Sequence, residues 1–107
     1  MTTNSTRHSD RFSLDALIGR RVVLDTASSL IYIGELRAVE EAGFWLVDAD
    51  LHDRNEGHST KEEYVSEARR LAAGGARRVN RRRVFVERRA VVSLSALDDV
   101  VTDDAAE

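Results

Sequence analysis

The chain has 107 residues, of which 42% are hydrophobic and 33% charged, a composition typical of one globular domain and not of a disordered segment. It has a net charge of −3 and no cysteine, which excludes disulfides and thiolate metal sites. No apolar run approaches the roughly 20 residues that cross a membrane, and residues 1–11 lack the apolar core of a signal peptide. We therefore expect a cytoplasmic protein with no membrane segment.

The first residues, 1–12, show no apolar periodicity and are expected to form a flexible tail. Ser13 is a good N-cap for a short helix over residues 14–18, which Gly19 would end. The β-branched run at residues 22–24 then predicts the first strand, followed by a turn of small polar residues.

The second predicted strand, residues 30–39, contains a glycine near its middle, Gly34. A glycine inside a strand weakens a flat strand but permits a sharp bend. Residues 40–43 make the next turn, and the apolar run that begins at Phe44 predicts a third strand that continues to Leu51.

An insertion with helical periodicity follows, at about residues 59–73. Its start offers two capping boxes, one formed by Ser59 with Glu62 and one by Thr60 with Glu63. Apolar residues recur along it at helical spacing and give the helix one apolar stripe.

Two further strands, residues 79–86 and 90–94, complete a domain that we place at residues 13–101, with an acidic tail at residues 102–107. Five strands with a short N-terminal helix and an inserted helix predict a mainly β fold. Its architecture is expected to be a five-stranded antiparallel barrel.

The charge is unevenly distributed along the chain. Nine arginines and one acid, Glu87, lie between residues 69 and 89. Such a cluster is typical of proteins that bind phosphates or carboxylates, because the guanidinium fork bonds them bidentately. Two interpretations stay open: the cluster binds a partner, or it pairs with acids of its own or a neighbouring subunit.

Two stretches resemble the motifs of the Sm-like family. The pattern Tyr32-x-Gly34-x-Leu36, followed by Glu40 or Glu41, is similar to the first Sm motif. The second motif is similar to Phe85-Val86-Glu87-Arg88 with the apolar strand after it, Val91-Val92-Ser93-Leu94. The helical insertion lies between the third and fourth strands, where family members differ in length.

The resemblance implies a strongly bent, SH3-like barrel that assembles into a homo-oligomeric ring of six or seven subunits, in which strand four of one subunit pairs with strand five of the next. In the family, single-stranded RNA threads the pore, where one base stacks on a side chain and is held by an Asn and an Arg. Here the Asn position holds Phe44 or Trp45, and Glu87 and Arg88 replace the Arg-Gly pair. The family's uridine pocket is therefore changed in this chain.

Candidate RNA-binding residues are arginines of the clustered run and the aromatics of the third strand: Arg81, Arg82, Arg83, Arg88, Arg89, Phe44 and Trp45. Together with Phe85 they would supply cations and stacking faces. The alternative is that the aromatics belong to the core. Consecutive arginines in a strand point to opposite faces, so at least one of Arg81–Arg83 grips a partner or bridges to acids such as Asp48 and Asp50.

Other chemistry finds little support in the sequence. The acidic stretch Asp48, Asp50, His52, Asp53, Glu56, His58 matches no metal-ligand template and is interpreted as a solvated loop. The three histidines form no nucleophile–base pair, so we expect neither an enzyme nor a cofactor. The alternative function is a protein-interaction or scaffolding module without RNA binding, whose inserted helix docks a partner and whose arginines are structural.

Overall fold

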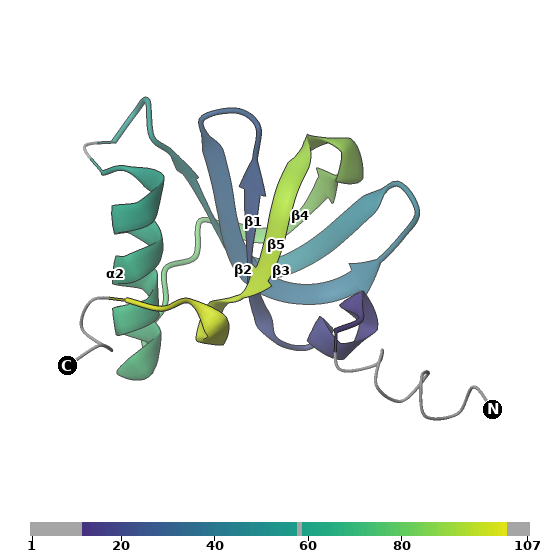
Figure 1. The fold of residues 1–107 in the computed structure, drawn as a ribbon, viewed down its shortest axis with the longest axis horizontal. Coiled ribbons are helices and arrows are strands. Elements are labelled where there is room, and N and C mark those ends of the chain that lie inside the picture. Colours follow the sequence, from purple (N-terminus) through teal and green to yellow (C-terminus); the bar gives the residue numbers. More distant parts are fainter. Residues whose placement is uncertain (1–11, 58, 103–107) are drawn as a thin grey trace.

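The computed structural model describes residues 12–57 and 59–102. In these residues, five antiparallel strands form one bent sheet in the order β4-β3-β2-β1-β5, with helix α2 beside it (Figure 1). The elements are η1 (Leu14–Leu17), β1 (Arg21–Thr26), β2 (Leu30–Val39), β3 (Gly43–Asp53), α2 (Lys61–Ala73), β4 (Arg81–Glu87), η2 (Arg88–Ala90), β5 (Val91–Ala96) and η3 (Leu97–Asp99). The expected mainly β fold is confirmed. The predictions for residues 1–11, His58 and residues 103–107 lie outside the described residues.

The sheet does not close into the expected barrel. Strand β4 pairs with β3 and β5 pairs with β1, so these two strands lie at opposite edges of the sheet. One side of each edge strand therefore keeps backbone N–H and C=O groups that no other strand of the described chain pairs with.

The pairing of β2 with β3 is irregular at Gly34, the residue at which the sequence predicts a bend, and irregularities of this kind bend a strand. The β2–β3 register shifts between Ile33 and Glu35, and Asp48 on the facing strand has a φ of 47°. A Cβ atom at Gly34 would stand 2.7 Å from the Cβ of Ala49, closer than two carbon atoms pack. The two strands approach this closely at the bend because residue 34 has no side chain.

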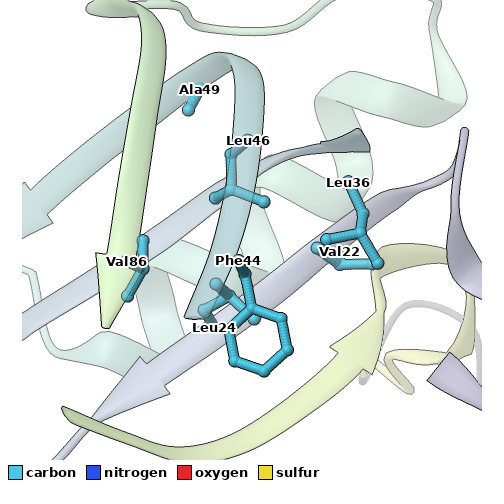
Figure 2. Packing of buried hydrophobic residues seen from close by; sticks show 7 residues of the cluster. All are labelled: Val22, Leu24, Leu36, Phe44, Leu46, Ala49 and Val86. Carbon is cyan, nitrogen blue, oxygen red and sulfur yellow. The ribbon is translucent and has the colours of Figure 1, made fainter. Parts of the chain in front are cut away.

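One apolar core fills the inner face of the bent sheet (Figure 2). Alternate residues of four strands point into it. Its fully or nearly buried members are Val22, Leu24, Leu36, Phe44, Leu46, Ala49 and Val86.

Helix α2 covers part of the opposite, outer face of the sheet. Val23, Ile31 and Ile33 point to this face and form a second cluster with Tyr64 of α2 and Leu97 of η3. The apolar stripe of the inserted helix thus packs against the chain's own sheet, with Tyr64 buried and Val65, Ala68 and Ala72 partly buried.

The helix ends show which capping signals operate. The Thr60 hydroxyl accepts from the backbone N–H of Glu63, whose carboxylate accepts from the N–H of Thr60, so the second of the two predicted capping boxes is the one that forms. The N-terminal helix is shorter than expected. It is a single 3-10 turn capped by Ser13, because Ile18 already has an extended backbone conformation.

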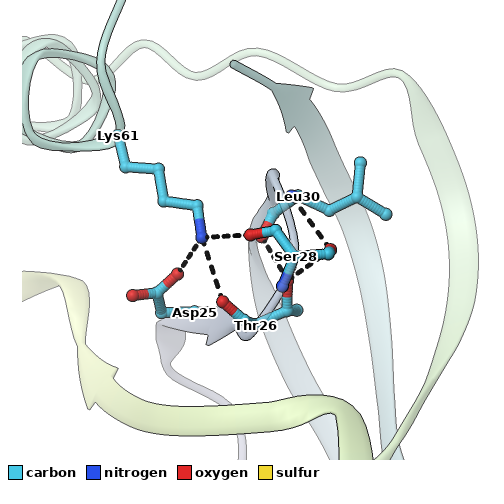
Figure 3. A network of polar contacts seen from close by, with 5 residues as sticks. All are labelled: Asp25, Thr26, Ser28, Leu30 and Lys61. Carbon is cyan, nitrogen blue, oxygen red and sulfur yellow. Dashed lines mark hydrogen bonds and ion pairs between the residues drawn. The ribbon is translucent and has the colours of Figure 1, made fainter. Parts of the chain in front are cut away.

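The only lysine of the chain joins α2 to the β1–β2 turn (Figure 3). The Lys61 Nζ donates to Asp25 Oδ1 at 2.7 Å, to the Thr26 carbonyl at 3.0 Å and to the Ser28 carbonyl at 2.7 Å. Its side chain is 19% exposed. This ammonium therefore uses its three donors to hold the first turn of the helix against the sheet.

Candidate nucleic-acid interface

The β2–β3 turn and η2 meet at one end of the sheet, where the Sm resemblance places the RNA pocket. Here Arg88 Nε donates to the Glu41 carbonyl at 3.0 Å and Arg88 Nη2 to the Glu40 carbonyl at 2.8 Å. Its guanidinium also lies 5.0 Å from the centroid of the Phe44 ring, within range of a cation–π contact. Arg88 therefore stabilises this turn, and at least two of its N–H donors bind backbone carbonyls of the chain itself.

Acids dominate the rest of this end. The side chains of Glu40 and Glu41 are exposed, and Glu87 pairs with Arg89 at 2.8 Å between two well-exposed groups. Arg89 therefore has an acidic neighbour that offsets its charge. This end of the sheet is a poor match for phosphate groups.

The three arginines that begin β4 have a different environment. Arg81, Arg82 and Arg83 are all exposed. Arg81 Nη1 donates to the carbonyl of Asn80 at 3.0 Å, whereas neither Arg82 nor Arg83 has a side-chain hydrogen bond or ion pair to another residue within ranges 12–57 and 59–102.

Of the two alternatives for this run, the bridges to Asp48 and Asp50 do not form. Asp48 pairs with Arg77 at 3.2 Å, and the Tyr64 hydroxyl donates to Asp50 Oδ2 at 2.6 Å. Burial is the main cause, and this hydrogen bond the next, of a pKa of Tyr64 raised above its ordinary value. The acids near the run are therefore satisfied by other residues.

The two aromatics proposed for stacking on RNA lie on opposite faces of β3. Phe44 is 4% exposed and belongs to the inner core, as in the core alternative, so its ring offers no stacking face to a ligand. Trp45 points to the outer face and is partly exposed. Its ring lies 5.0 Å from that of Phe85, with 57° between the ring planes.

The sequence analysis names Phe85 as a possible stacking residue but does not assign it to a face of the sheet. The signal was present in the strand period: Val84 and Val86 face the core, so Phe85 must share the outer face with Arg83.

The first part of the acidic stretch is not the solvated loop that was expected: Asp48, Asp50, His52 and Asp53 belong to strand β3. The His52 ring stacks on Tyr64, with ring centroids 4.2 Å apart and 9° between the planes. Among the described residues, no group of three or more His, Cys, Asp or Glu side chains is arranged to hold a metal ion. Also within the described part of the chain, none of the helices has the length and apolar character that crossing a membrane requires.

Comparison with known proteins supports the fold. Sequence comparison finds no matching protein-family model and no matching curated protein. Among solved structures, the chain is similar to a Pyrococcus abyssii Sm protein in complex with a uridine heptamer, with a TM-score of 0.51 and 11% identity over 77% of this chain and 89% of that one. It is also similar to a chain of the NatC complex bound to CoA, with a TM-score of 0.52 and 20% identity over 81% of this chain and 86% of that one. The chain therefore has an Sm-like fold.

Proposed function

We propose that the chain is a non-enzymatic, cytoplasmic Sm-like module that forms a homo-oligomeric ring and binds single-stranded RNA through the arginines of β4. The observation that carries this proposal is the run Arg81–Arg83, exposed on an edge strand, two of whose members have no partner in the described chain. Similarity to an Sm protein in complex with a uridine heptamer gives the fold a precedent for RNA as ligand.

Assembly is proposed from the two open edges. Strand β4 of one copy and β5 of the next can pair in antiparallel fashion, and repetition around a six- or seven-membered ring leaves no edge unpaired. The side chain of Val92 on β5 is 62% exposed, as expected of a residue that packs against another copy.

Light scattering tests the assembly. At micromolar concentration the parent protein should have a mass several times that of the 12.0 kDa chain. Val92→Lys places a charge on the edge strand and should shift the mass towards one chain. Val101→Lys is the matched control, because Val101 is 85% exposed outside the strands and its substitution should leave the mass unchanged. A monomeric parent protein contradicts the ring.

The salt dependence of RNA binding tests the arginines. Changing Arg81, Arg82 and Arg83 together to Gln should reduce the slope of log K against log salt by about 0.7 for each arginine that contacts a phosphate of the single strand, which is about 2 if all three do. Arg54→Gln, at an exposed residue after β3, is the single-charge control away from β4. If the triple variant instead dissociates the oligomer or lowers its melting temperature, the arginines are structural and RNA binding through them is refuted.

A second candidate function is a protein-interaction subunit. The end of the sheet where an Sm pocket would lie favours this function, because several acids lie there and Arg88 donates to backbone carbonyls. This end is therefore poorly suited to bind RNA phosphates. The similarity to a chain of the NatC complex is in keeping with such a role. A parent protein that assembles but has no measurable affinity for RNA at low salt would favour this candidate.

A further inference from the structure

Strand β4 divides its side chains between the two faces of the sheet. Val84 and Val86 lie opposite Leu46 and Phe44 and face the inner core. Because side chains alternate along a strand, Phe85 and Arg83 point to the outer face and Arg82 points to the inner side. The charge run is therefore not one uniform patch.

The outer side of β4 and β3 combines an aromatic pair with a cation. Phe85 is directly opposite Trp45, and Arg83 is opposite the next outward residue of β3, Val47. Cross-strand geometry places Arg83 diagonally beside Trp45, at about 7–8 Å between backbones, within reach of a long side chain. Helix α2 covers the outer face elsewhere, and both rings stay partly exposed.

Gly43 helps to position the aromatic pair. A Cβ atom at Gly43 would stand 2.7 Å from the Phe85 ring, so the ring lies over a residue that has no side chain. The contact with Trp45 fixes its other side. A stacking surface that is already ordered loses little conformational entropy when a ligand binds.

Acids near this surface are paired. Glu35 lies opposite Val47 on the neighbouring strand and accepts from Arg37 Nη2 at 3.2 Å. Glu87, two residues beyond Phe85, accepts from Arg89 Nε at 2.8 Å. Neither carboxylate therefore presents an unbalanced charge to a phosphate.

We infer that single-stranded RNA lies on this outer face, with one base stacked against the Trp45–Phe85 pair and an adjacent phosphate bound by Arg83. This inference rests on the proposed function and specifies its site. Base–aromatic stacking accepts any base, so the site recognises a flexible single strand and not a particular sequence. The site lies on the outer face of the sheet, whereas Arg88 contacts the ring of Phe44, which belongs to the inner core.

Fluorescence of Trp45 tests the inference directly, because it is the only tryptophan of the chain. The parent protein is titrated with a uridine heptamer and with an abasic heptamer that has the same phosphates but no bases. The uridine heptamer should quench Trp45 and bind roughly 5- to 150-fold more tightly than the abasic one. This comparison uses the unaltered chain, so it does not depend on whether a variant folds.

Three variants then identify the face. Phe85→Leu keeps an apolar group over Gly43 and should lower affinity for the uridine heptamer at least about fivefold with the salt slope unchanged. Arg83→Gln should reduce the slope by about 0.7. Arg82→Gln removes the same charge from the inner side and should keep the full quench of Trp45.

The possible outcomes separate the two proposals. If both heptamers bind equally and Trp45 is not quenched, charge-based RNA binding stands and stacking is refuted. If Arg82→Gln abolishes the quench and Arg83→Gln does not, the outer face is the wrong one. If neither heptamer binds the parent protein, the proposed function itself fails and this site fails with it.

Discussion

Adding one methyl group at Gly34 tests the account of the bend. The new Cβ would stand 2.7 Å from Ala49 Cβ, 3.0 Å from Ala49 Cα and 3.3 Å from the Val47 carbonyl oxygen. Two of these three atoms belong to the backbone and cannot rotate away. Overpacking of this kind costs about 1–3 kcal/mol, and replacing glycine returns about 0.4–1 kcal/mol through the unfolded chain. Gly34→Ala should therefore lower the free energy of unfolding by about 1–2 kcal/mol, and Gly34→Val by up to about 3 kcal/mol.

Urea denaturation followed by circular dichroism measures this loss, at one fixed protein concentration because oligomerisation contributes to apparent stability. For a domain of this size, each kcal/mol corresponds to roughly 4–8 °C in melting temperature. Gly74→Ala is the matched control. Gly74 has a φ of −93°, and a Cβ there meets only the Leu71 carbonyl oxygen, at 3.6 Å. This change should be neutral or slightly stabilising.

A double-mutant cycle isolates the collision. Ala49→Gly removes the methyl group that a Cβ at Gly34 would strike, although it destabilises the chain by itself. If the two methyl groups compete for one space, the double variant should be more stable than the sum of the single changes predicts, by about 0.5–3 kcal/mol. Strictly additive losses, or a Gly34→Val protein that melts like the parent, would refute the reasoning about the bend.

Three further changes test other contacts. Lys61→Met should lower the free energy of unfolding by about 1.5–3 kcal/mol in urea denaturation, since it removes charged hydrogen bonds to the β1–β2 turn; an unchanged midpoint would contradict the role of this ammonium. Burial, then the bond to Asp50, raises the pKa of Tyr64, so unfolding releases its proton above about pH 10 and stability falls as the pH rises through that range. Tyr64→Phe should remove this part of the pH dependence. If the free energy of unfolding falls with the same slope between pH 9 and 11 in the parent protein and in Tyr64→Phe, this prediction is wrong. Arg88→Gln should lower the free energy of unfolding by about 1–3 kcal/mol but leave the salt slope of RNA binding unchanged. A reduced slope would show that Arg88 contacts the RNA.

Features that depend on local sequence patterns are predictable from the sequence. The five strands appear in the predicted order because alternating apolar residues have to face a core. Gly34 lies at the bend because a mid-strand glycine is costly unless a close approach requires it. Thr60 caps the inserted helix because the capping box needs only residues within one turn.

Features that depend on tertiary pairing were not accessible in the same way. Phe44 and Trp45 look alike in the sequence, and only the register with β4 assigns one to the core and the other to the outer face. The edge positions of β4 and β5 follow from which strands pair; the Sm resemblance implies them, whereas the strand pattern alone does not. Arg88 looked free to bind a ligand because backbone carbonyls, its actual partners, leave no sequence signal.

The strand order also determines how the chain folds. Strands β1, β2 and β3 follow one another in the sequence and are neighbours in the sheet, so short turns connect their pairings. By contrast, β5 pairs with β1 across most of the sequence, with Val22 opposite Ala96. Closing this long loop has the largest entropic cost of the strand pairings. Until β5 arrives, β1 presents an open edge that a β5 strand from another molecule fits equally well. Refolding at high concentration should therefore produce molecules that have exchanged β5.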